Sequence, residues 1–115
     1  MKDIKGEITY NGKVYPYVFN LNVMEAIQDE YGTLDKWGEL TDGSSGEVNA
    51  KALIFGFTAM FNEGIDIQNE EKGTNEPPVT LKQVGRMVWA VGLENAAQKM
   101  NDLIVDSTKS DEKNA

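Results

Sequence analysis

The sequence predicts an α+β domain that is mostly helical, with an N-terminal antiparallel β-hairpin and four or five helices packed around a central helix at residues 48–62. Two observations support this fold class. First, the dipeptide Asn11-Gly12 separates two short segments of alternating pattern, which is typical of a tight hairpin turn. Second, residues 48–62 are the most apolar run of the chain, with Leu53, Phe57 and Phe61 at helical spacing. A helix that is apolar nearly all round is covered by other elements.

Length and composition limit the possible classes of protein. A chain of 115 residues has room for one domain. We expect this domain to span residues 1–105 and the polar tail 106–115, which has no apolar residue larger than alanine, to be disordered. The chain has no cysteine and no histidine, so it lacks thiolate chemistry, the commonest general base and the commonest metal ligand. Its net charge of −8 disfavours binding to nucleic acid or to an anionic membrane.

The hairpin is expected to consist of strands at residues 6–10 and 13–19. Pro16 has no backbone N–H, so the second strand should lie at a sheet edge or break at this residue. An isolated hairpin is only marginally stable in water. We therefore expect this hairpin to pack against the helices or against another chain.

Capping signals predict the helices that follow. Asn22 with Glu25 is typical of a helix start, and Gly32 should end that helix. Thr33 can cap a second, short helix that carries Trp37.

The second half of the chain contains three further signals. Gly64 is expected to stop the central helix, and residues 65–78 are expected to form an exposed loop of above-usual length. Thr80 and Gln83 form a capping box that should open the next helix. Gly92 should kink or divide this helical stretch, whose apolar periodicity continues beyond it.

No set of residues has the spacing that catalysis or metal binding requires. Asp66, Gln68 and Glu70 suggest a calcium loop, but an EF-hand needs glycine where Glu71 stands and glutamate where Pro77 stands. A solvated acidic loop is favoured instead. We therefore predict that the protein is not an enzyme, with no catalytic residue, no metal and no cofactor.

Large apolar side chains could form a contact surface for a partner protein. Methionine-rich and aromatic faces adapt to several partners, although residues of these types more often belong to the core. The basic residues Lys82, Arg86 and Lys99 are dispersed and predict no track for nucleic acid. We predict that the partner-binding surface includes exposed side chains from the set Trp37, Met60, Phe61, Met87 and Trp89.

The N-terminal third of the sequence combines a tyrosine-containing hairpin, a Tyr-Pro step and a helix that ends in Tyr-Gly. The residues of this combination are Asn11, Gly12, Tyr15, Pro16, Phe19, Asn22, Ile27, Tyr31, Gly32, Leu34 and Trp37. It resembles the opening of the tail assembly chaperones of long-tailed phages. The rest of the chain resembles that family in size, acidity, a central apolar helix and a disordered end.

This resemblance implies a specific function and location. Such chaperones bind the aggregation-prone tape measure protein, keep it soluble and help tail tube subunits polymerise around it. The resemblance thus implies a viral or prophage protein in the cytoplasm of the bacterial host cell, absent from the mature virion. Its expected partner is the tape measure protein, with the tail tube protein as a further candidate and self-association left open. An acidic inhibitor or DNA mimic, or another small protein-binding module, stays an alternative.

Overall fold

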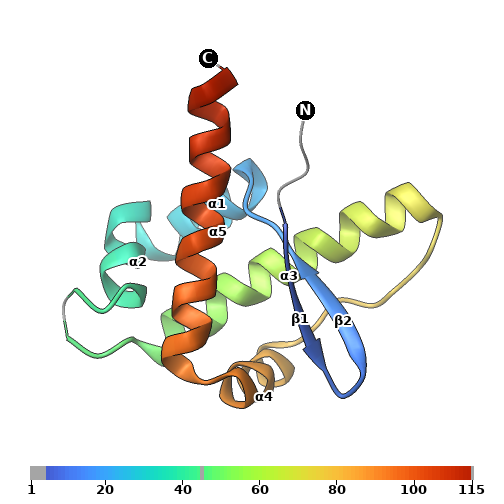
Figure 1. Cartoon of the computed structure of the whole chain (residues 1–115), viewed down its shortest axis with the longest axis horizontal. Helices are drawn as coiled ribbons and strands as arrows, with labels where there is room; N and C mark the ends of the chain where they lie inside the picture. Colours follow the sequence, from blue (N-terminus) through green and yellow to red (C-terminus); the bar gives the residue numbers. More distant parts are fainter. Residues whose placement is uncertain (1–4, 45, 115) are drawn as a thin grey trace.

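The computed structural model describes residues 5–44 and 46–114 and confirms the predicted fold class (Figure 1). Its elements are β1 (Gly6–Tyr10), β2 (Lys13–Tyr17), α1 (Leu21–Tyr31), α2 (Leu34–Thr41), α3 (Ala50–Lys72), α4 (Leu81–Val91) and α5 (Leu93–Asn114). The central helix α3 contacts β2 and every other helix of the described chain. Within the same residues, no helix has the length and apolar character needed to cross a membrane.

The hairpin turn has the backbone conformation that its sequence predicts. Asn11 and Gly12 have φ angles of 51° and 78°, the positive values of a tight two-residue turn. Counting from this turn, Pro16 lies opposite Glu7 in a pair that exchanges no backbone hydrogen bonds. The missing N–H of Pro16 therefore removes no hydrogen bond from the hairpin, and β2 continues as an edge strand to Tyr17.

Aromatic contacts fix the hairpin on α3. The Tyr17 ring meets Phe57 and Phe61 edge-on, with centroid separations of 5.3 and 5.6 Å. Geometry of this kind stabilises a contact by about 0.5–1.5 kcal/mol beyond the area it buries. Close to these rings, a Cβ atom at Gly64 would lie 2.7 Å from the carbonyl oxygen of Pro16. Only glycine lets the strand backbone approach the helix so closely.

The central helix is longer than the sequence predicts. The prediction that Gly64 stops it is wrong, since Gly64 is a buried helical residue and α3 continues to Lys72. The predicted loop at 65–78 is correspondingly wrong over residues 65–72, because Ile65 extends the buried face of the helix. The helix ends instead at Gly73, whose φ of 66° is the left-handed value of a C-terminal cap.

The central helix begins at Ala50, two residues later than predicted. Of the predicted capping residues, one is shifted and those of α2 and α4 are confirmed. The cap of α1 is Asn20, whose side-chain oxygen accepts a hydrogen bond from the Val23 amide at 3.2 Å. The predicted cap, Asn22, lies inside the helix and donates to the Glu63 carboxylate at 3.0 Å. The confirmed starts of α2 and α4 have capping side chains from Thr33, Thr80 and Gln83.

The division expected at Gly92 is confirmed. This residue, with φ of 102°, ends α4, and the chain changes direction there so that α5 rises past α3 (Figure 1). Helix α5 includes residues 106–114, the segment in which the sequence predicts a disordered tail. Residues 1–4 and 115 lie outside the described chain, and its division into a domain at 1–105 and a disordered tail stays a prediction.

Candidate functional site

Four of the five predicted partner-binding residues lie in the core. Their side chains are at most 2% exposed; they are Trp37, Met60, Phe61 and Met87. These four are therefore core residues, as the alternative for each of them predicted, and partner binding by an exposed member of the set stays a prediction. Trp89 differs, because 86% of its surface is exposed. A candidate binding surface in this structure has to be built around Trp89.

The orientation of each helix explains this distribution. Trp37 points from the short α2 toward α3, and its indole Nε1–H donates to the Ala52 carbonyl oxygen at 2.9 Å. In α4, Val84, Met87 and Val88 are buried. Trp89 is one position further along and so projects from the opposite side of the helix.

The exposed side of α4 forms a continuous stripe. Lys82, Arg86 and Trp89 follow each other at spacings of four and three residues, which places them on one face. All three are exposed. Leu81, at the start of the helix, is 56% exposed and lies about 80–100° around the helix from Trp89 and Lys82, at the border with the buried side. We call Leu81, Lys82, Arg86 and Trp89 the α4 outer face. It presents an indole and a leucine beside two cations.

The charge of this face is opposite to that of the rest of the molecule. Helix α4 contains Lys82 and Arg86 but no acidic residue. Since these two cations are included in the net charge of −8, the remainder of the chain has a charge of −10. Within the described residues, neither cation forms an ion pair with a carboxylate. In the described part of the chain, both cations thus lack an intramolecular carboxylate partner and can face an external one.

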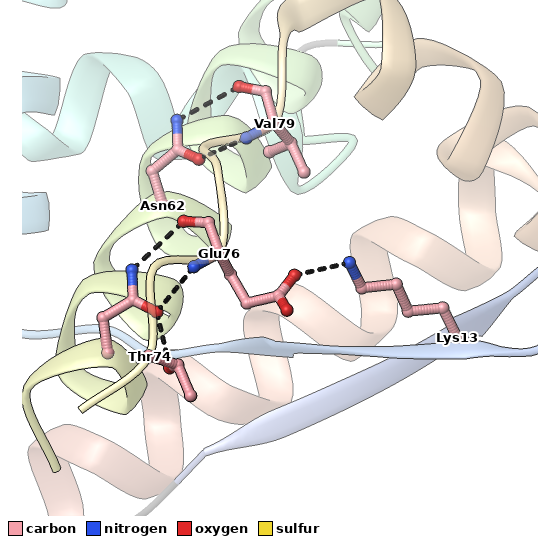
Figure 2. A network of polar contacts seen from close by, with 6 residues as sticks. Lys13, Asn62, Thr74, Glu76 and Val79 are labelled. Atoms are coloured by element: carbon pink, nitrogen blue, oxygen red, sulfur yellow. Dashed lines mark hydrogen bonds and ion pairs between the residues drawn. The ribbon is translucent and has the colours of Figure 1, made fainter. Parts of the chain in front are cut away.

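A second surface feature is a cleft between the hairpin, the C-terminal half of α3 and the loop at 73–80. Its volume is about 340 Å³, and its walls include Lys13, Tyr15, Ile65, Lys72, Glu76 and Pro77. The Lys13 ammonium donates to the Glu76 carboxylate at 2.8 Å across this cleft (Figure 2). That hydrogen bond, with the charge of Glu76, raises the pKa of Lys13. This contact connects the hairpin to the loop.

Two asparagines of α3 hold the same loop. The Asn62 side chain accepts from the Val79 amide at 2.8 Å and donates to the Val79 carbonyl at 3.3 Å (Figure 2). About two turns further along α3, Asn69 accepts from the Glu76 amide at 3.0 Å and from the Thr74 hydroxyl at 2.8 Å. The loop backbone belongs to neither a helix nor a sheet, so these side chains supply the partners that its amide and carbonyl groups need. The polar groups beside the cleft thus hold the loop in place.

Among residues 5–44 and 46–114, no group of three or more acidic side chains is placed to hold a metal ion. Lys82 and Arg86 were not predicted as part of a protein contact, although their helical spacing to Trp89 is visible in the sequence. Leu81 has no such spacing to Trp89, and only the structure shows that it is exposed. Comparisons of the chain with protein-family models, with curated proteins and with solved structures found no match. Its function is therefore inferred from its own surface and from the resemblance of its N-terminal third.

Proposed function

We propose that this protein is a non-enzymatic tail assembly chaperone of a long-tailed phage or prophage that binds the tape measure protein. It would act in the cytoplasm of the bacterial host cell, before the virion is complete, and would be absent from the mature particle. The tail tube protein is its second candidate partner. The observation that supports this proposal most directly is the exposed Trp89 on a molecule whose other tryptophan is sealed in the core.

The α4 outer face has the composition of a protein contact. Tryptophan and arginine are enriched among the residues that dominate binding energy at protein interfaces. A single exposed apolar side chain is common on folded proteins, so the proposal depends on the combination of Trp89 with Arg86 on one helix face. A long helical partner offers amphipathic faces that can pack against such a stripe. The net charge of −8 would help to keep the resulting complex soluble.

The proposal is tested by co-expression with a fragment of the tape measure protein. The fragment alone should be mostly insoluble, and co-expression should move it into the soluble fraction and allow co-purification. If the fragment stays equally insoluble with and without this protein, the proposal is wrong. The alternative of a DNA mimic predicts a different result, namely competition with DNA for a target enzyme with strong salt dependence.

A further inference from the structure

We infer that the α4 outer face docks an amphipathic helix whose apolar stripe is flanked by carboxylates. Trp89 and Leu81 would pack against that stripe, while Lys82 and Arg86 would pair with the carboxylates. This inference deepens the proposed function and rests on it, since the tape measure protein would supply the helix. It assigns to the contact a chemical class of partner that the resemblance does not specify.

Charge complementarity determines the choice of occupant. The two cations of α4 have no ion-pair partner among the described residues, and the rest of the chain has a charge of −10 once their charge is removed from the total of −8. The molecule as a whole repels acidic partners, so an acidic helix would be attracted only where positive charge is concentrated. A basic helix would find favourable charge over most of the remaining surface and would not select this face.

The position of Lys82 supports the same conclusion. It lies in the first turn of α4, which contains no acidic residue. The helix dipole places partial positive charge at that end, so a cation there is unfavourable by about 0.3–1 kcal/mol and an anion is favourable. Stability of α4 therefore does not explain this lysine. Its charge adds to the positive potential at this end of the helix, which a partner carboxylate can use.

The size of the face suggests weak and reversible binding. Helix α4 has 11 residues and is about 16 Å long, so it can accompany a partner helix for roughly three turns. Such a contact falls below the ~1,200 Å² of a standard stable interface. Transient binding is what a chaperone requires, because it must release its partner during assembly.

The test uses the full chain and two designed peptides. Both peptides form amphipathic helices of four turns with the same leucine stripe, flanked by glutamates in one and by lysines in the other. Binding is measured by fluorescence anisotropy of labelled peptide. The wild-type protein should bind the glutamate peptide at least tenfold more tightly than the lysine peptide, and this preference should weaken with added salt. Equal binding of both peptides would overturn the inference.

Three variants locate the contact. Trp89→Ala should weaken binding of the glutamate peptide at least tenfold, and the double variant Lys82→Glu with Arg86→Glu should reverse the preference toward the lysine peptide. Lys36→Glu, which changes an exposed lysine on α2 and half as much charge as the double variant, is the charge control and should retain the wild-type preference. Circular dichroism of each variant shows whether the fold is intact. An effect of Lys36→Glu as large as that of the double variant would refute a specific α4 site.

Other occupants of the face would give distinct results. If Trp89→Ala abolishes a concentration-dependent dimer in sedimentation while the peptides do not bind, a second copy occupies the face and the inference is wrong. Binding to vesicles of anionic lipid without peptide binding would likewise overturn it. The wild-type indole emission reports such contacts, since Trp37 is 2% exposed and only Trp89 can change its environment.

The two proposals can fail separately. If the α4 variants solubilise the tape measure fragment as well as the wild type does, the chaperone function stands and the docking inference fails. If the glutamate peptide binds as expected but the fragment is never solubilised, the docking site stands and the chaperone function fails.

Discussion

The Trp37 indole packs against Gly56 so closely that no larger residue fits at that position. A Cβ atom on Gly56 would lie 2.4 Å from Cζ2 of Trp37. The indole cannot withdraw easily, because its Nε1–H is hydrogen-bonded to the Ala52 carbonyl one turn earlier in α3. A glycine inside a helix costs about 1 kcal/mol relative to alanine, and this contact is the reason that α3 has one at Gly56.

Gly56→Ala should therefore destabilise the protein, although alanine is the better helix former. The forced displacement of Trp37 should lower the free energy of unfolding by about 1–3 kcal/mol in urea denaturation. Gly38→Ala in α2 is the matched control, because a Cβ there would meet no atom within 4 Å. It should raise stability by about 0.5–1 kcal/mol. Equal stability of the two variants would show that the Trp37 contact has no energetic weight.

Asn62→Ala should release the loop at 73–80 from α3. The change removes both hydrogen bonds to Val79, whose buried backbone groups would then lack partners, at a cost of about 1–3 kcal/mol. Hydrogen exchange of the Val79 amide should accelerate together with the loss of global stability. Asn75→Ala, in the exposed part of the same loop, should change stability by less than about 0.5 kcal/mol. Unchanged hydrogen exchange of the Val79 amide in Asn62→Ala would contradict this role of Asn62 in holding the loop.

Tyr17 should make the protein sensitive to alkaline pH. Its burial, with a smaller contribution from the charge of Asp102, raises the pKa of its hydroxyl above the ordinary value of 10.0. Because the folded-state pKa lies above the unfolded one, the stabilisation is complete below about pH 10 and is lost as pH rises through the folded-state pKa. Urea midpoints measured between pH 8 and 11 should fall less steeply for Tyr17→Phe than for the wild type. If the urea midpoints of the two proteins fall in parallel as pH rises, the Tyr17 hydroxyl makes no such contribution to stability.

Some alkaline sensitivity should persist in Tyr17→Phe. The pKa of Tyr31 is also raised by burial, and that of Lys13 is raised by its hydrogen bond to Glu76. Both groups lose their favourable protonated state in the same direction of pH. The difference between the two curves, rather than either curve alone, therefore isolates Tyr17.

Thr80→Ala should weaken the start of α4. The Thr80 hydroxyl accepts from the Gln83 amide at 3.2 Å, and the Gln83 side chain accepts from the Thr80 amide at 2.8 Å. Loss of an N-cap of this kind costs about 1 kcal/mol, whereas Thr80→Ser keeps the hydroxyl and should stay near wild-type stability. Thermal unfolding followed by circular dichroism checks both variants. A loss of similar size in Thr80→Ser would point to the threonine methyl group instead.

Features determined by neighbouring residues could be predicted from the sequence. The turn at Asn11-Gly12 needs only positive φ angles, which these two residue types tolerate best. The box at Thr80 and Gln83 is similarly closed within one helical turn. Their physics involves no distant partner, so the prediction and the structure agree.

Features that depend on distant partners could not be predicted in this way. Gly64 has the local chemistry of a helix stop, yet its role is to admit the backbone of Pro16, which is far away in sequence. Asn20 and Asn22 also both donate to the Glu63 carboxylate, a distant contact that the local capping pattern does not indicate.

The candidate site shows the same limit. Apolar character alone cannot distinguish a core residue from a contact residue, so both Trp37 and Trp89 were candidates for a contact surface in the sequence. The helical phase of α4 separates them, because Met87 and Val88 define its buried side and leave Trp89 on the other. Lys82 and Arg86 could have been added by projecting the same helix, once its boundaries were known.

The packing of the Tyr17 ring against Phe57 and Phe61 has a consequence for folding during synthesis. The hairpin is translated first, but the aromatic rings that cover it are added about forty residues later, a delay of several seconds at ~5–20 residues per second. Until Phe57 and Phe61 have been added, Tyr17 has no ring of α3 to pack against, so the native contact between hairpin and helix cannot form before α3 is synthesised.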